Sequence, residues 1–138
     1  MKKYIRSSKL IKHVDSNYGD TGEISSHSML IYLRRELQNS TIFNDSNYQI
    51  KYKLKNDSYL SSDILTIVCS DSRNNNVACA QYLESKIASV KEVAENVMID
   101  CGYEERLSNL NISVYEGMDG FRDDPSYIAV KIKYDSIS

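Results

Sequence analysis

The sequence has few of the residues on which catalytic and metal sites are usually built. Its histidines are His13 and His27 alone, and its cysteines are Cys69, Cys79 and Cys101. A nucleophilic site needs a base beside the nucleophile, commonly histidine, and a structural zinc needs four Cys or His ligands at short, paired spacings. The cysteines lie too far apart in the sequence to form such pairs. Free cysteines of this kind are usually small, buried, apolar side chains. We therefore predict a protein that is not an enzyme and uses no cofactor or metal ion.

Two spacings imitate catalytic motifs, and we interpret both as accidental. Tyr82 and Lys86 have the YxxxK spacing of short-chain dehydrogenases, but no glycine-rich turn between a strand and a helix precedes them. Glu84 and Lys86 imitate the ExK element of restriction-type nucleases, which lies on a strand, whereas these residues lie within a predicted helix. Neither pattern changes the prediction of a non-enzymatic protein.

Long apolar runs and disulfide patterns are also missing. No apolar run approaches the roughly 20 residues of a membrane span, and no continuous apolar segment follows the basic first residues. An odd number of cysteines without close pairs does not form a disulfide framework. These absences lead us to expect a cytoplasmic protein without a membrane partner.

Proline and glycine are scarce, with one and five residues in a chain of 138. No segment rich in either divides the chain, so we expect one domain at residues 25–138. Residues 1–24 end in the turn-forming stretch SNYGDTGE and are expected to form a flexible arm. The arm is basic, because residues 1–14 contain no acid and include the cations Lys2, Lys3, Arg6, Lys9 and Lys12.

Two segments have the period of an amphipathic helix. Residues 26–38 place leucines at helical spacing, after serines that can cap a helix. Residues 77–101 carry a longer apolar stripe and are followed by Gly102, a residue typical of helix ends. We interpret this stripe as a face that packs on the protein's own sheet rather than as a coiled-coil seam. Its members are Ala80, Leu83, Ile87, Val90, Ala94, Val97 and Cys101.

Four segments are predicted to be strands. Residues 48–55 alternate apolar and polar side chains, and residues 127–134 do the same. Residues 63–71 contain a nearly continuous apolar run, which is typical of a strand that is central or covered on both faces. Residues 111–115 supply the fourth strand.

Together, these segments follow the order helix, strand, strand, helix, strand, strand after a basic arm. We therefore expect an α+β fold, in which two helices, one of them long, pack on one face of a four-stranded, largely antiparallel sheet. One arrangement with this order of elements is a circular permutation of the ferredoxin-like fold.

The polar sides of two predicted strands carry lysine. With Tyr115 and Tyr127 as stacking partners, such a face is typical of surfaces that bind single-stranded nucleic acid. Lysine also protects exposed edge strands from pairing and keeps a protein soluble. Which interpretation holds depends on whether the two strands are neighbours in the sheet. The lysines are Lys51, Lys53 and Lys55 in one strand and Lys131 and Lys133 in the other.

An acidic segment before the last strand is a candidate partner-binding site. Carboxylates on a projecting loop can occupy a basic groove that a nucleic acid would otherwise fill, and an aromatic side chain can anchor the contact. The candidate residues are Glu116, Asp119, Phe121, Asp123 and Asp124.

The composition points to a genomic neighbourhood. The chain is rich in Lys, Asn, Ile, Ser, Asp and Tyr, which resembles the usage of AT-rich Firmicutes genomes and of their phages and plasmids. Its opening MKKYIRSS resembles the starts of small proteins carried on such mobile elements. A basic arm, a helix, a hairpin, a long helix and closing strands also resemble the layout of small anti-CRISPR inhibitors of type II systems. This resemblance implies a host protein or ribonucleoprotein as partner, such as a Cas nuclease, and assigns no site residues.

Three functional hypotheses follow. The first is a phage or mobile-element protein that binds and inhibits a host macromolecule, such as a CRISPR–Cas nuclease. The second is a small nucleic-acid-binding or regulatory module, which needs a local basic surface because the net charge is −2. The third is a structural protein that assembles through a sheet edge. The candidate nucleic-acid-binding residues are Lys3, Arg6, Lys9, Lys12, Lys51, Lys53, Lys55, Lys131 and Lys133.

Overall fold

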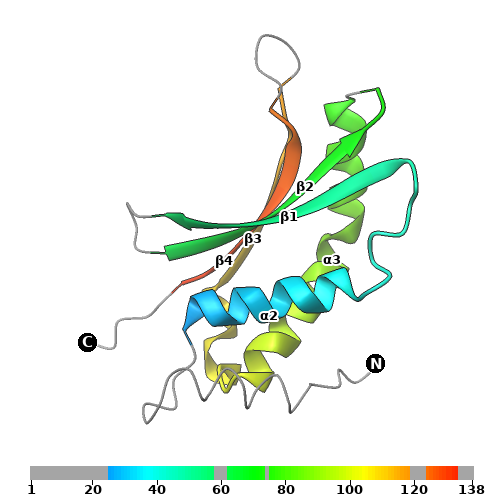
Figure 1. The fold of residues 1–138 in the computed structure, drawn as a ribbon. Coiled ribbons are helices and arrows are strands. Elements are labelled where there is room, and N and C mark those ends of the chain that lie inside the picture. Colours follow the sequence, from blue (N-terminus) through cyan, green and yellow to red (C-terminus); the bar gives the residue numbers. More distant parts are fainter. Residues whose placement is uncertain (1–24, 58–61, 74, 119–123, 134–138) are drawn as a thin grey trace.

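The computed structural model describes residues 25–57, 62–73, 75–118 and 124–133 (Figure 1). The expected basic arm at residues 1–24 lies outside the described residues. The binding candidates that lie outside them are Lys3, Arg6, Lys9, Lys12, Asp119, Phe121 and Asp123.

Both helices begin within one residue of their expected starts, and each has a side-chain cap. α2 (Ser26–Gln38) starts after Ser25, whose side chain accepts a hydrogen bond from the backbone N–H of Ser28. α3 (Asn76–Asp100) starts after Asn75, whose side chain accepts a hydrogen bond from a backbone N–H in the first turn. Each cap satisfies an N–H group that the helix itself leaves unpaired.

The end of α3 also follows its prediction. Gly102 has a φ of 83°, which glycine adopts without strain. The next residue, Tyr103, donates its N–H to the carbonyl oxygen of Met98 over 2.8 Å, which completes a Schellman motif. The sequence predicts a polar turn after this point, but the structure has a short 3₁₀ helix, η2 (Glu104–Asn109). Leu107 explains the difference, because it packs against the core and holds the segment in place.

The strands form one antiparallel sheet in the order β1-β2-β4-β3. Both helices pack on the same face of this sheet (Figure 1). The predicted α+β class, with two helices on one face of a four-stranded antiparallel sheet, is confirmed. The first two strands pair antiparallel, and the second of them is interior, as its apolar run predicts. The strands are β1 (Tyr48–Asp57), β2 (Ser62–Asp71), β3 (Leu110–Tyr115) and β4 (Ser126–Ile132).

β2, α3 and β3 form a split β-α-β unit. β2 and β3 are each antiparallel to β4, so they run parallel to one another with β4 between them. Split β-α-β units are the building blocks of ferredoxin-like folds. The strand order is therefore compatible with a circular permutation of that arrangement.

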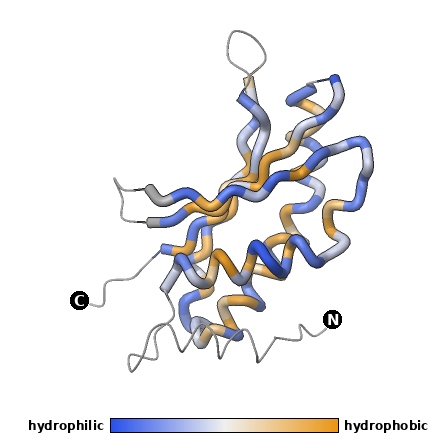
Figure 2. The backbone as a smooth tube through the Cα atoms, in the orientation of Figure 1, coloured by the Kyte–Doolittle hydropathy of each residue, from blue (hydrophilic) through white to orange (hydrophobic). Residues whose placement is uncertain are grey.

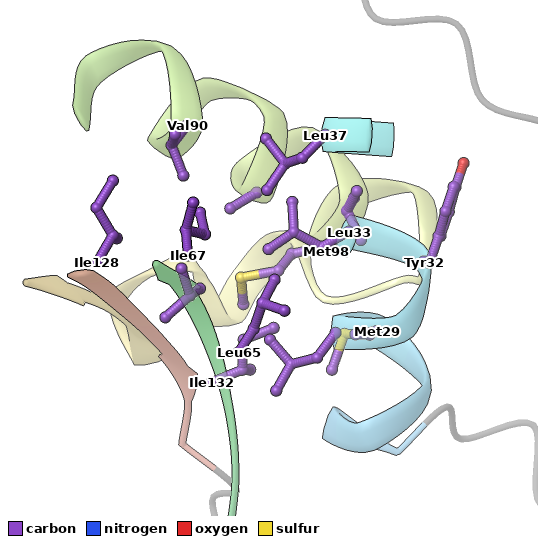
Figure 3. Close-up of a cluster of buried hydrophobic side chains, with 14 of the residues drawn as sticks. Met29, Tyr32, Leu33, Leu37, Leu65, Ile67, Val90, Met98, Ile128 and Ile132 are labelled. Carbon is purple, nitrogen blue, oxygen red and sulfur yellow. The ribbon is translucent and has the colours of Figure 1, made fainter. Parts of the chain in front are cut away.

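The core lies between the sheet and the two helices. Apolar residues concentrate where these layers face each other (Figure 2). Side chains of β2 such as Leu65 and Ile67 meet Met98 of α3 in the interior (Figure 3). The predicted apolar stripe of α3 is buried except for Ile87, which is half-buried. The cysteines at positions 69, 79 and 101 are free and buried, as predicted.

Candidate nucleic-acid interface on the open sheet face

The candidate site is the face of the sheet opposite the two helices, which we call the open face. Because side chains alternate along a strand, every second residue of each strand points to it. The register aligns these side chains in cross-strand rows that span all four strands. From β1 to β3, consecutive rows are Lys51–Val68–Tyr127–Tyr115, Lys53–Thr66–Ala129–Ser113 and Lys55–Ile64–Lys131–Asn111.

The two lysine-bearing strands are not neighbours. β1 is an edge strand, β4 is an interior strand, and β2 lies between them. Edge protection accounts for the exposed lysines of β1, since lysine on an edge opposes pairing with another sheet. It does not account for Lys131, because both sides of β4 are already paired. Lys131 instead shares a row with Lys55, and Ile64 lies between them.

A shallow groove of about 640 Å³ lies over the open face. Its floor consists of small and apolar side chains from the two interior strands, and lysines stand at its rim. The sequence did not single out the floor residues of β2, although the apolar run that contains them was a signal. Both described helices lie on one side of this central strand, so half of such a run lies on the open face. The floor is Ile64, Thr66, Val68 and Ala129, and the rim lysines are Lys53, Lys55 and Lys131.

Two tyrosines form an aromatic platform at one end of this groove. The rings of Tyr115 and Tyr127 stack with their centroids 5.0 Å apart and their planes at 24°. They come from neighbouring strands and are directly opposite in the register. Tyr115 is 47% exposed, and Met118, which also lines the groove, is 72% exposed. An accessible ring of this kind offers a surface on which a flat ligand can stack.

The acidic candidates that the structure describes, Glu116 and Asp124, are exposed and line the same end of the groove. Glu116 and Asp124 belong to two chain segments that are joined by a hydrogen bond: Gly117 donates its N–H to Oγ of Ser126 over 2.9 Å. Ser126 Oγ in turn donates to the carbonyl oxygen of Asn76, at the start of α3, over 2.8 Å. A Cβ atom on Gly117 would overlap the carbonyl oxygen of Asp124, so this approach requires glycine.

Among the residues that line the groove, cations and carboxylates are concentrated at opposite ends, with Lys53 between them; Lys51 shares the row of the tyrosines but is not part of the lining. Lys55 and Lys131 lie at one end, and Lys133, which follows β4 on the same side, extends this end. The tyrosine platform and the two carboxylates lie at the other. Lys131 and Tyr127 are four residues apart on β4, which corresponds to about 13 Å along the strand. The groove thus combines a cationic end with an aromatic end, as a ligand with both a phosphate and a flat ring requires.

His27, in the first turn of α2, contacts a carboxylate and not a nucleophilic side chain. His27 Nδ1 lies 2.7 Å from Oδ2 of Asp63 on β2, and the carboxylate is largely buried. This contact joins the start of α2 to the sheet.

Tyr82, from the YxxxK spacing, also has structural partners. Its hydroxyl oxygen accepts a hydrogen bond from the backbone N–H of Asp45 over 3.3 Å. Its ring stacks on Tyr48, with centroids 4.3 Å apart, and Lys86 Nζ lies 5.6 Å from its centroid. These contacts fasten the segment before β1 to α3.

Burial raises the pKa of the thiols of Cys69 and Cys79 above the ordinary value, which opposes formation of a reactive thiolate. Across the described ranges, no group of three or more His, Cys, Asp or Glu side chains is placed to hold a metal ion. In the same part of the chain, no helix has the length and apolar character needed to cross a membrane.

The fold and the groove define an α+β protein with an open, lysine-rimmed sheet face. The chain matches no protein-family model, no curated protein and no solved structure.

Proposed function

We propose that this is a non-enzymatic binding protein and that its open face holds a short stretch of single-stranded nucleic acid. The observation that carries the proposal is the exposed stack of Tyr115 on Tyr127 in the same groove as Lys53, Lys55 and Lys131. Bases stack on aromatic side chains, and phosphates pair with cations, on open sheets that bind single strands.

The position of Lys131 supports this proposal. An interior strand has no free edge to protect, so a half-buried lysine there needs another explanation. Its aliphatic stem can cover Ile64 while its ammonium group reaches the solvent above the groove. A phosphate above this row would lie between Lys55 and Lys131.

The carboxylates indicate which end of the groove holds bases and which end holds phosphates. Glu116 and Asp124 repel phosphates at the aromatic end of the groove, so a base fits there better than the backbone does. We therefore place bases over Tyr115 and Tyr127 and phosphates over Lys55 and Lys131.

Binding of fluorescein-labelled oligothymidylate and oligouridylate of about 12 nucleotides, measured by fluorescence anisotropy at low salt, tests the proposal. Tyr115→Ala and Lys131→Gln should each weaken binding. Lys91→Gln is the matched control, because Lys91 is exposed on α3 and lies away from the open face. No detectable binding of either oligonucleotide at low salt would overturn the proposal.

Inhibition of a host nuclease is a second candidate function. It is supported by the exposed Glu116 and Asp124, whose chain segments are fastened together through Gly117 and Ser126. Carboxylates on a fixed support can compete with a nucleic acid for a basic groove of a partner protein. Target cleavage by a purified type II CRISPR nuclease should then slow in the presence of the protein and recover with the double change Glu116→Gln and Asp124→Asn. Unchanged cleavage across several such nucleases would contradict this function.

A further inference from the structure

The outer side of β1 is a second surface with the features of a binding site. β1 is the first strand in the sheet order, and within the described ranges no strand pairs with its outer side. Thr66 Oγ1 on β2 donates to the carbonyl oxygen of Lys53 over 3.1 Å, so the backbone groups of Lys53 point toward β2. Backbone groups alternate in direction along an antiparallel strand. Those of Ile50, Tyr52 and Leu54 therefore point outward.

A groove of about 360 Å³, lined by aliphatic and aromatic residues together with Gln38 and Ser40, runs along this edge on the helix side of the sheet. α2 packs mainly under β2, so its last turn leaves room beside β1, which lies at the edge of the sheet above α2 in Figure 1. The walls are fixed, because the rings of Phe43 and Tyr48 both pack on Tyr82. The lining residues are Leu37, Gln38, Ser40, Phe43, Tyr48, Ile50 and Tyr52.

We propose that the outer edge of β1 binds an extended peptide as an additional strand, and that this peptide alternates apolar and acidic residues. The edge supplies backbone hydrogen bonds, and the pockets beside it select side chains, as in other cases of strand addition. Every second side chain of the added strand enters this groove and packs beside Ile50 and Tyr52. The others lie on the open face beside Lys51, Lys53 and Lys55, where carboxylates pair favourably across strands.

Charge excludes two other occupants of this edge. When two copies of β1 pair antiparallel about a two-fold axis, residues directly opposite share a face, so the three lysines of one copy would oppose those of the other. The sequence of residues 1–14 is basic throughout and would meet the same repulsion. An acidic strand from a partner protein would be attracted by the three lysines rather than repelled.

The test uses two fluorescent peptides matched in length to β1, one of alternating valine and glutamate and one of alternating valine and lysine. Each lysine–glutamate pair contributes roughly 0.5 kcal/mol, so the acidic peptide should bind at least about tenfold more tightly. Hydrogen exchange at the amides of Ile50, Tyr52 and Leu54 should slow on binding. Gln38→Trp fills the groove from the exposed end of α2 and should weaken binding, whereas Gln81→Trp, on the exposed side of α3, should not.

The proposal is overturned if neither peptide binds, if both bind equally, or if the outward amides of β1 remain unprotected in the complex. Equal binding by the Gln38→Trp variant and the native protein would also overturn it. These outcomes are independent of the proposed nucleic-acid function, because Gln38 lies on the helix side of the sheet and Tyr115 lies on the open face.

Discussion

Replacing Lys131 by glutamine tests the proposed nucleic-acid interface through its salt dependence. Glutamine keeps a polar, unbranched side chain above Ile64 but removes the charge from the interior of the open face. A single strand releases about 0.7 counterion for each phosphate that a cation neutralises. If Lys53, Lys55 and Lys131 each contact one phosphate, the logarithm of the association constant falls against the logarithm of salt concentration with a slope of about −2.

This slope predicts measurable differences between variants. From about 50 to 200 mM salt, the native protein should lose about twentyfold in affinity, and Lys131→Gln only about sevenfold. Tyr115→Ala removes stacking rather than charge. It should weaken binding by about 1–3 kcal/mol, roughly 5- to 150-fold, at every salt concentration and leave the slope unchanged.

Anisotropy titrations of labelled oligothymidylate at four or more salt concentrations measure both quantities. The Lys91→Gln variant reports the effect of removing an exposed lysine far from the groove. An unchanged slope in Lys131→Gln, or an equal change in Lys91→Gln, would refute the assignment of phosphates to the lysine end. An unchanged affinity in Tyr115→Ala would refute stacking at the aromatic end.

Three further predictions concern stability and reactivity. Gly117→Ala should lower the free energy of unfolding in urea by about 1–3 kcal/mol, because the new Cβ overlaps the backbone of Asp124; an unchanged midpoint would contradict the close approach. Burial raises the pKa of Tyr52 to about 12 from an ordinary 10.0, so from pH 10 to 12 the unfolded chain loses a proton that the folded chain keeps. The free energy of unfolding should therefore fall by at most about 1.4 kcal/mol per pH unit there, and less in Tyr52→Phe; equal pH profiles would contradict this. Labelling of Cys69 and Cys79 by a thiol reagent should be as slow as unfolding, because both thiols are buried, and rapid labelling of the native protein would show that they are accessible.

The helices and strands were predictable because their signals are local. The serine cap before α2, the stripe along α3 and the glycine at the end of α3 each lie within a short segment, and each reappears in the structure. The same holds for the apolar side of β1 and for β4. The 3₁₀ helix η2 was not predicted, since its order depends on packing of Leu107 against elements far away in the sequence.

The candidate sites were predictable only in part. Alternation along single strands identified the lysines of β1, as well as Lys131, Tyr115 and Tyr127 as candidates. The floor of the groove was missed, because Ile64 and Val68 resemble ordinary core residues until it is known that both described helices pack on the other face. The groove along the outer edge of β1 was also missed. Phe43 and Tyr48, which line it, lie in different segments, and only the folded chain brings them together.

By itself, the sequence determined the α+β class, the order of the elements, the apolar stripe of α3 and the approximate bounds of the two helices. Periodicity and capping act over a few residues, so one sequence contains them in full. Only the tertiary structure decided that β2 separates the two lysine strands, that Tyr115 stacks on Tyr127, and that β1 lies at the edge. These properties depend on which distant segments pair and in which register, and many pairings bury the same apolar stripes equally well.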